Sequence, residues 1–212
     1  MMLRETFPVG PLQCNCTILA CADTKDAVII DPGGDAHRIG EIVAYYDLTV
    51  KAIIHTHAHI DHIYSTHQVK TEHGGEVCLH RDDMALYQGV AAQATMIGVR
   101  PCETTPVERF IEHGDTIEFG KRNALVIHTP GHTEGSVCFE VHNDRDTIVF
   151  AGDTLFRRGI GRTDLPGGNM RKIVTSIRDR LYTLRPDAMV IPGHGPTTTI
   201  AEEAAKNPFV TA

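Results

Sequence analysis

Short apolar segments rich in β-branched residues recur along the chain, separated by polar or glycine-containing stretches. This pattern predicts β-strands, because apolar runs of about four to eight residues suit a buried sheet. Residues 15–22 and 27–30 flank a short polar stretch and predict a β-hairpin. Further strands are expected over residues 50–54, 76–79, 117–119, 125–128, 136–141, 147–150 and 189–191.

Other segments carry apolar residues at helical spacing and predict helices between the strands. Asp35 and Asn169 each stand directly before such a segment, where their side chains can cap the first turn. Helices are expected from Asp35 to about Tyr46, over residues 63–72 and 81–98, from Asn169 to about Leu184, and from about Ile200. Strands that alternate with helices indicate an α/β fold.

The composition fits a globular protein rather than a disordered, membrane-spanning or nucleic-acid-binding chain. Apolar residues make up 42% of the sequence, enough for a substantial core, and the net charge is −7 with no basic tract. No apolar run approaches the roughly 18 residues that cross a bilayer, and the N-terminus lacks the apolar segment of an export signal. We therefore expect a cytoplasmic protein that binds neither nucleic acid nor membrane, with its six cysteines as free thiols.

Four of the expected strands end in loops that carry a residue able to bind a metal. These residues are His57, His132, Asp153 and His194. A glycine directly precedes each of the last three, which lets the backbone turn sharply. Because α/β scaffolds build their sites from loops at one rim of a sheet, we expect these four loops to converge.

The densest chemical signal is the run HAHIDH at residues 57–62, which places four potential metal ligands within six positions. Alternate residues of an extended loop point the same way, so His57, His59 and Asp61 would face one side. His62 would face the other side, and one loop could then serve two metals. The remaining ligands are expected to be His132, Asp153 and His194, since imidazole and carboxylate groups suit zinc, iron or manganese.

The other eight of the 13 histidines are not expected to bind metal. His55 precedes the run and is expected to pack beside the site or to support it. The rest are expected on solvated helix faces or strand ends: His37, His67, His73, His80, His113, His128 and His142.

Several motifs around these residues resemble the metallo-β-lactamase superfamily. The matching segments are DPG at 31–33, THAHIDH at 56–62, TPGHT at 129–133, AGDTL at 151–155 and PGHG at 192–195. The resemblance implies a four-layer αββα sandwich, formed by residues 1–212 as a single domain, with two metals at one edge. It also implies the ligands: His57, His59 and His132 for the first metal, Asp61, His62 and His194 for the second, and Asp153 as the bridge. Asp31 would support the ligands from behind.

Within the superfamily, segments 151–156 and 161–164 resemble the glyoxalase II-like branch, which implies that Arg162 binds a substrate carboxylate. The chain ends about 18 residues after His194, so we expect it to lack the C-terminal helical extension of full-length glyoxalase II. Two tyrosines of that branch are also missing, one of them at the position of Asp164. The metal chemistry therefore carries over, while the recognition of glutathione stays open.

The predicted activity is metal-dependent hydrolysis of a thioester such as S-D-lactoylglutathione, by a hydroxide formed from metal-bound water. Two divalent ions, zinc in first place, would activate the water and receive the leaving thiolate. Asp61 and Asp153 would be the catalytic carboxylates, with Asp61 orienting the water. An iron-dependent persulfide dioxygenase and a hydrolase of another ester, lactone or β-lactam are the open alternatives. Whether the protein is a monomer or a homo-oligomer is also open.

Overall fold

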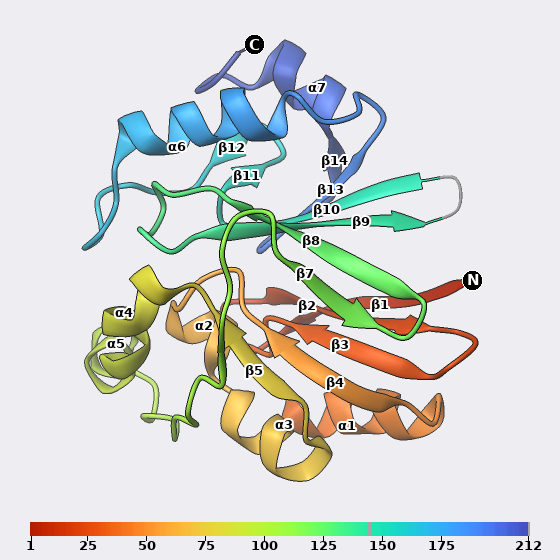
Figure 1. The fold of residues 1–212 in the computed structure, drawn as a ribbon. Coiled ribbons are helices and arrows are strands. Elements are labelled where there is room, and N and C mark those ends of the chain that lie inside the picture. Colours follow the sequence, from red (N-terminus) through yellow and green to blue (C-terminus); the bar gives the residue numbers. More distant parts are fainter. Residues whose placement is uncertain (144–145, 212) are drawn as a thin grey trace.

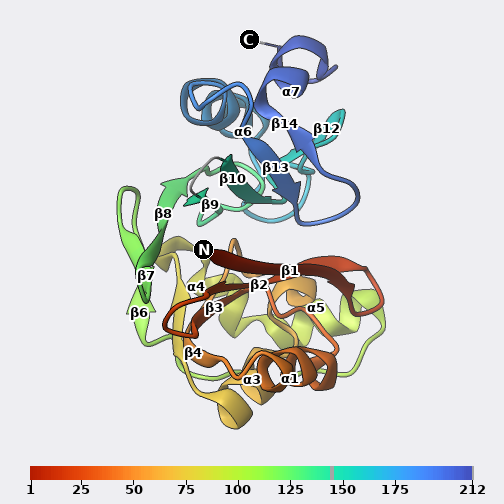
Figure 2. The same ribbon diagram turned by 90° about the vertical axis from the view of Figure 1, so that its right-hand side faces the viewer.

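Two six-stranded β-sheets pack face to face in the computed structural model, which describes residues 1–143 and 146–211. Helices cover the outer face of each sheet and give four layers in the order α, β, β and α (Figures 1 and 2). The predicted α/β class and four-layer sandwich are therefore confirmed. No helix in the described residues is long and apolar enough to cross a membrane.

Parallel strands bring several loops to the same edge of the two sheets. The N-terminal sheet has the order β1 (Met2–Val9), β2 (Cys14–Cys21), β3 (Asp26–Ile30), β4 (Thr49–Ile54), β5 (Glu76–Leu79) and β6 (Arg109–Phe110). The C-terminal sheet has the order β14 (Thr198–Thr199), β13 (Met189–Pro192), β10 (Asp146–Gly152), β9 (Val137–Asn143), β8 (Arg122–His128) and β7 (Thr116–Phe119). Strands β3 to β6 are parallel to one another, as are β10 and β13. A two-stranded ribbon pairs β11 (Leu155–Phe156) with β12 (Gly159–Ile160).

The helices fall into two groups, one for each sheet (Figure 2). Beside the N-terminal sheet lie α1 (Ala36–Tyr45), α2 (Ile60–Ile63), α3 (Thr66–His73), the 3₁₀ turn η1 (Arg81–Asp83), α4 (Met84–Gln88) and α5 (Val90–Ile97). The C-terminal sheet is covered by α6 (Met170–Ser176), the π-helical segment η2 (Ile177–Leu181) and α7 (Ile200–Lys206).

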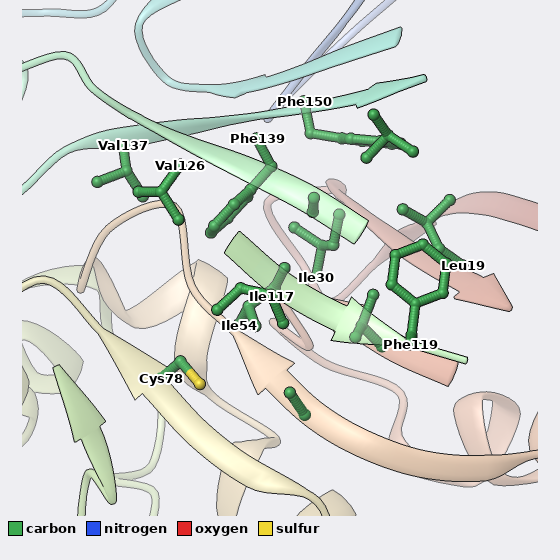
Figure 3. Packing of buried hydrophobic residues seen from close by; sticks show 14 of the residues in the cluster. Leu19, Ile30, Ile54, Cys78, Ile117, Phe119, Val126, Val137, Phe139 and Phe150 are labelled. Atoms are coloured by element: carbon green, nitrogen blue, oxygen red, sulfur yellow. The ribbon is translucent and has the colours of Figure 1, made fainter. Parts of the chain in front are cut away.

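The main core lies between the sheets, where side chains from both inner faces interdigitate (Figure 3). Phe139 and Phe150 of the C-terminal sheet are buried in the same cluster as Leu19, Ile30 and Ile54 of the N-terminal sheet. Three further clusters fix the outer helices to the sheets. The rigid centre therefore holds the strand ends, and the loops that follow them, in fixed positions.

Most of the predicted strands are confirmed, whereas β1 was missed. Its pattern is diluted by the exposed Arg4 and Thr6, and it contains Pro8, which usually argues against a strand. The strand tolerates proline because it lies at the edge of the sheet and pairs only with β2.

Two predicted helices are interrupted, and one predicted cap is wrong. The segment 63–72 breaks because the backbone N–H of Ser65 donates to the carbonyl of Pro32, and the segment 81–98 breaks at Gly89. Asp35 does not cap α1: its backbone is left-handed (φ 50°), and its carboxylate accepts from the N–H of Gly10 instead. The cap at Asn169 is confirmed, because its side chain accepts from the N–H of Lys172.

Candidate metal centre

Three histidine nitrogens from two loops converge on one point. The loop after β4 supplies His57 and His59, whose Nε2 and Nδ1 atoms lie 3.0 Å apart. The loop after β8 supplies His132, whose Nε2 lies 2.9 Å from the same Nδ1 of His59. Three nitrogens bound tetrahedrally to one zinc ion lie about 3.3 Å from one another. The first predicted ligand set is therefore brought together in a geometry close to that of a metal site.

A second cluster lies beside the first and contains Asp61, His62 and His194. The Oδ2 atom of Asp61 is 3.0 Å from His194 Nε2 and 3.7 Å from His62 Nε2. Helix α2 begins at Ile60, so the extended alternation expected for this run stops at His59. That expectation was wrong for Asp61, which turns away from His57 and His59 and joins His62 in the second cluster.

Asp153, at the end of β10, stands between the two clusters. Its Oδ2 atom lies 3.6 Å from His132 Nε2 in the first cluster. Its Oδ1 atom lies 3.5 Å from His62 Nε2 and 3.8 Å from His194 Nε2 in the second. Each carboxylate oxygen thus faces a different cluster, which is the arrangement of a bridging carboxylate.

The buried polar atoms of the two clusters and of Asp153 fit divalent metal ions. His62 Nε2 and Asp153 Oδ1 are buried and have no hydrogen-bond partner in the part of the chain that the structure describes. Such atoms are costly unless a partner or a metal satisfies them. Gly193 keeps space at this point, because a Cβ there would lie 2.2 Å from Asp153 Oδ1 and 2.7 Å from His62 Cε1.

Hydrogen bonds on the far side of each ring fix which nitrogen faces the centre. The Nδ1–H of His132 donates to the carbonyl of Arg162 over 2.9 Å, and that of His194 to the carbonyl of Leu12 over 3.0 Å. His62 Nδ1 lies 2.9 Å from Asp31 Oδ2. In each case the contact of Nδ1 turns Nε2 toward the centre, as in metal sites that are oriented by supporting groups.

Asp31 occupies the supporting position that was predicted for it. Besides holding His62, it accepts hydrogen bonds from the backbone N–H of Thr56 (2.8 Å) and from its hydroxyl (2.6 Å). The following Gly33 is required by close packing, because a Cβ at that position would lie 1.5 Å from the carbonyl oxygen of Asp61. The DPG segment therefore supports the second cluster from behind.

The protonation states also suit metal binding. Burial lowers the pKa of His59 to about 4, and burial lowers that of His57 well below its usual range, so both rings are neutral at pH 7. Burial alone would raise the pKa of Asp61, but the neighbouring His62 and His194 outweigh it and hold that pKa below its usual range. Burial alone would lower the pKa of His62 and His194, but the neighbouring carboxylates outweigh it and raise both pKa values. A metal ion would displace the proton from these two rings, because neutral imidazoles and ionised carboxylates are the forms that bind metals.

Asp83, in the turn before α4, was not predicted and links the two loops of the first cluster. Its buried carboxylate accepts hydrogen bonds from the N–H of Ala58 (2.9 Å), the N–H of Gly135 (2.7 Å) and the hydroxyl of Thr133 (2.9 Å). Ala58 lies between His57 and His59, and Thr133 follows His132. Asp83 therefore sets the spacing of all three histidines.

Arg162 contributes to the centre through its backbone rather than through its guanidinium. The guanidinium lies in an exposed ion pair with Asp164, with two hydrogen bonds of 2.8 and 2.7 Å. Its expected contact with a substrate carboxylate stays a prediction.

His80 and His128 stack with their ring centres 4.1 Å apart, and His128 Nε2 donates to the carbonyl of Glu134, which leaves that nitrogen no lone pair for a metal.

The comparisons with known proteins cover nearly the whole chain. The family model of the metallo-beta-lactamase superfamily matches residues 9–194. The hydroxyacylglutathione hydrolase GloC of Haemophilus influenzae is 36% identical over 208 residues, which is 97% of each chain. The solved structure of the BLEG-1 B3 metallo-beta-lactamase gives a TM-score of 0.90 at 36% identity, covering 99% of this chain and 100% of that one. The structure of TTHA1623 in a di-iron-bound form gives 0.86 at 35% identity, covering 97% and 100%.

Proposed function

The chain belongs to the metallo-beta-lactamase superfamily, and on that premise we propose that it hydrolyses thioesters with two divalent metal ions. The observation that carries the proposal is the position of Asp153, whose two carboxylate oxygens face different histidine clusters. A carboxylate placed in this way suits a two-metal centre better than a single-metal site. We choose S-D-lactoylglutathione as the test substrate, because the chain is similar to GloC, a hydroxyacylglutathione hydrolase.

Each of the two clusters would supply the ligands of one metal ion. His57, His59 and His132 would hold one ion; Asp61, His62 and His194 would hold the other; and Asp153 would contact both. When bound, the two ions supply Lewis acidity, which lowers the pKa of water toward about 7 and polarises a carbonyl oxygen. Zinc is the proposed metal because it suits imidazole and a thiolate leaving group, and iron and manganese are the alternatives.

Asp61 would position the attacking water, and the cysteine beside the site is not suited to act as the nucleophile. Asp61 Oδ2 lies at the second cluster, where its remaining lone pairs can accept a hydrogen bond from the attacking water and orient it. Cys14 lies beside the same cluster, with its Sγ 3.5 Å from His62 Nδ1. Burial raises the pKa of Cys14 to about 12, so the thiol stays protonated and is a poor nucleophile.

The proposal is tested by loading the metal-free protein with zinc, iron or manganese and measuring thiol release from S-D-lactoylglutathione. Oxygen uptake on glutathione persulfide is measured in parallel, because an iron-dependent dioxygenase is the competing activity. We expect thiol release without oxygen uptake. Oxygen uptake with one iron per chain and no thiol release would overturn the proposal.

A further inference from the structure

A cavity of about 290 Å³ opens beside Asp61. Its wall comes from the β1–β2 turn, the glycine turn after β3, helix α2 and the end of α5. The apolar side chains on this wall include Val9, Leu12, Ile60, Tyr64, Ile97 and Val99. The cavity is therefore built by segments of the chain that converge only in the folded protein.

The charges around this cavity disfavour an anionic ligand. No lysine or arginine lines it among the described residues, and its two charged residues, Asp35 and Asp61, are both acids. The carboxylate of Asp35 is already occupied by the N–H of Gly10 at 2.9 Å. A ligand carboxylate placed at the Asp35 end of the cavity would meet like charge without a lysine or arginine to neutralise it.

Two residues on the cavity wall, Asp61 and Leu12, join the cavity to the second cluster. Asp61 lines the cavity, and its Oδ2 is 3.0 Å from His194 Nε2. Leu12 also lines it, and the carbonyl of Leu12 accepts from His194 Nδ1. A group bound in the cavity would thus lie directly beside the reacting end of a substrate.

We propose that this cavity binds an uncharged apolar substituent of the thioester, adjacent to its scissile carbonyl. The inference rests on the proposed thioester hydrolysis and narrows its substrate class. At about 290 Å³ the cavity is at the lower end of pockets that hold a whole small molecule, so it takes one end of the substrate. It also accounts for two large apolar side chains left exposed, Leu12 at 48% and Ile97 at 43%.

The substituent can belong to the acyl side or to the thiol side, and two substrate series separate these sources. One series lengthens the acyl chain from acetyl to hexanoyl on N-acetylcysteamine, and the other lengthens the alkyl thiol of lactoyl thioesters from ethyl to hexyl. In the series whose chain enters the cavity, kcat/KM should rise about fourfold per methylene, which corresponds to about 0.8 kcal/mol. Hydrolysis of both series with no dependence on chain length would overturn the inference and leave thioester hydrolysis itself intact.

A pair of neighbouring substitutions tests the same site without relying on turnover. Ile97→Asp places a charge on the cavity wall, whereas Met96→Asp places it at the preceding residue, which is 76% exposed and does not line the cavity. The metal-free protein should bind the neutral apolar fluorophore 1-aminoanthracene, and Ile97→Asp should weaken this binding at least tenfold while Met96→Asp leaves it unchanged. No binding by the wild type, or equal binding by both variants, would overturn the inference whether or not thioesters are hydrolysed.

Discussion

His62 Nε2 lies 3.5 Å from Asp153 Oδ1, and among the described residues neither of these buried atoms has a hydrogen-bond partner. The two atoms form an ion pair but no hydrogen bond, and a buried polar atom without a hydrogen bond costs roughly 1–3 kcal/mol. A divalent ion between the two atoms would satisfy both.

Asp153→Asn should remove the carboxylate that joins the two clusters while it keeps the shape of the side chain. We expect the bound metal to fall from two ions per chain to one or fewer, and thioester hydrolysis to fall by at least about 100-fold. Metal content by mass spectrometry and the thiol-release assay check this. The matched control is Asp187→Asn, at an exposed aspartate that pairs with Arg185. A variant that kept two ions and full activity would argue against a bridging role for Asp153.

Metal removal should lower the stability of the folded protein. An ion present at 1,000 times its dissociation constant adds about 4 kcal/mol, because it binds only the folded state. For a chain of this length that corresponds to a rise in melting temperature of about 8–16 °C per site. Thermal unfolding with zinc, and then with a chelator, measures the difference. Identical melting temperatures in both conditions would contradict the presence of a metal centre.

The metal-free protein should lose stability as the pH falls from about 6.5 to 4. Burial lowers the pKa of His59 to about 4 in the folded state, against 6.5 for the free side chain. The unfolded chain therefore takes up a proton in this range that the folded chain does not, which costs up to about 3 kcal/mol at the acid end. Urea unfolding at several pH values should show a smaller loss for His59→Gln than for the wild type. A loss of equal size in both proteins would show that His59 is not buried as a neutral ring.

Asp83→Asn should weaken the first metal site without removing any ligand. The amide replaces one of the two oxygens that accept from Ala58, Thr133 and Gly135, so the two loops are no longer held at a fixed spacing. We expect the affinity for the first ion to fall about 10–100-fold, as it does for other groups that orient metal ligands. Competition with a chromophoric chelator measures that affinity. The neighbouring Asp82→Asn, at an exposed residue, is the control and should leave it unchanged.

The candidate ligands could be predicted from the sequence because each combines recognisable chemistry with a strand end. His57 follows β4, and Asp153 directly follows β10, so the order of strands and loops alone indicates that they meet at one edge. The strands were predictable for a similar reason, since their apolar residues form continuous runs. Among the strands longer than two residues the exception is β1, where an edge position leaves Arg4 and Thr6 exposed and weakens the pattern.

Apart from Asp31, the supporting residues could not be predicted, because their roles arise from contacts between distant parts of the chain. Asp83 accepts from Ala58, 25 residues before it, and from Gly135, 52 residues after it. The side chain of Asn15 donates to the carbonyls of Pro192 and Gly195 and so holds the His194 loop against β2. In the sequence, both residues look like ordinary turn or strand residues.

The most direct test of the two-metal account is the dependence of thioester hydrolysis on the number of zinc ions per chain. Metal-free protein is titrated with zinc, and thiol release from S-D-lactoylglutathione is measured at each point together with the bound metal. The account predicts that full activity requires two ions per wild-type chain. It also predicts that the Asp153→Asn variant does not reach full activity at any point of the zinc titration. Full activity at one ion per chain, in the wild type or in that variant, would contradict the account.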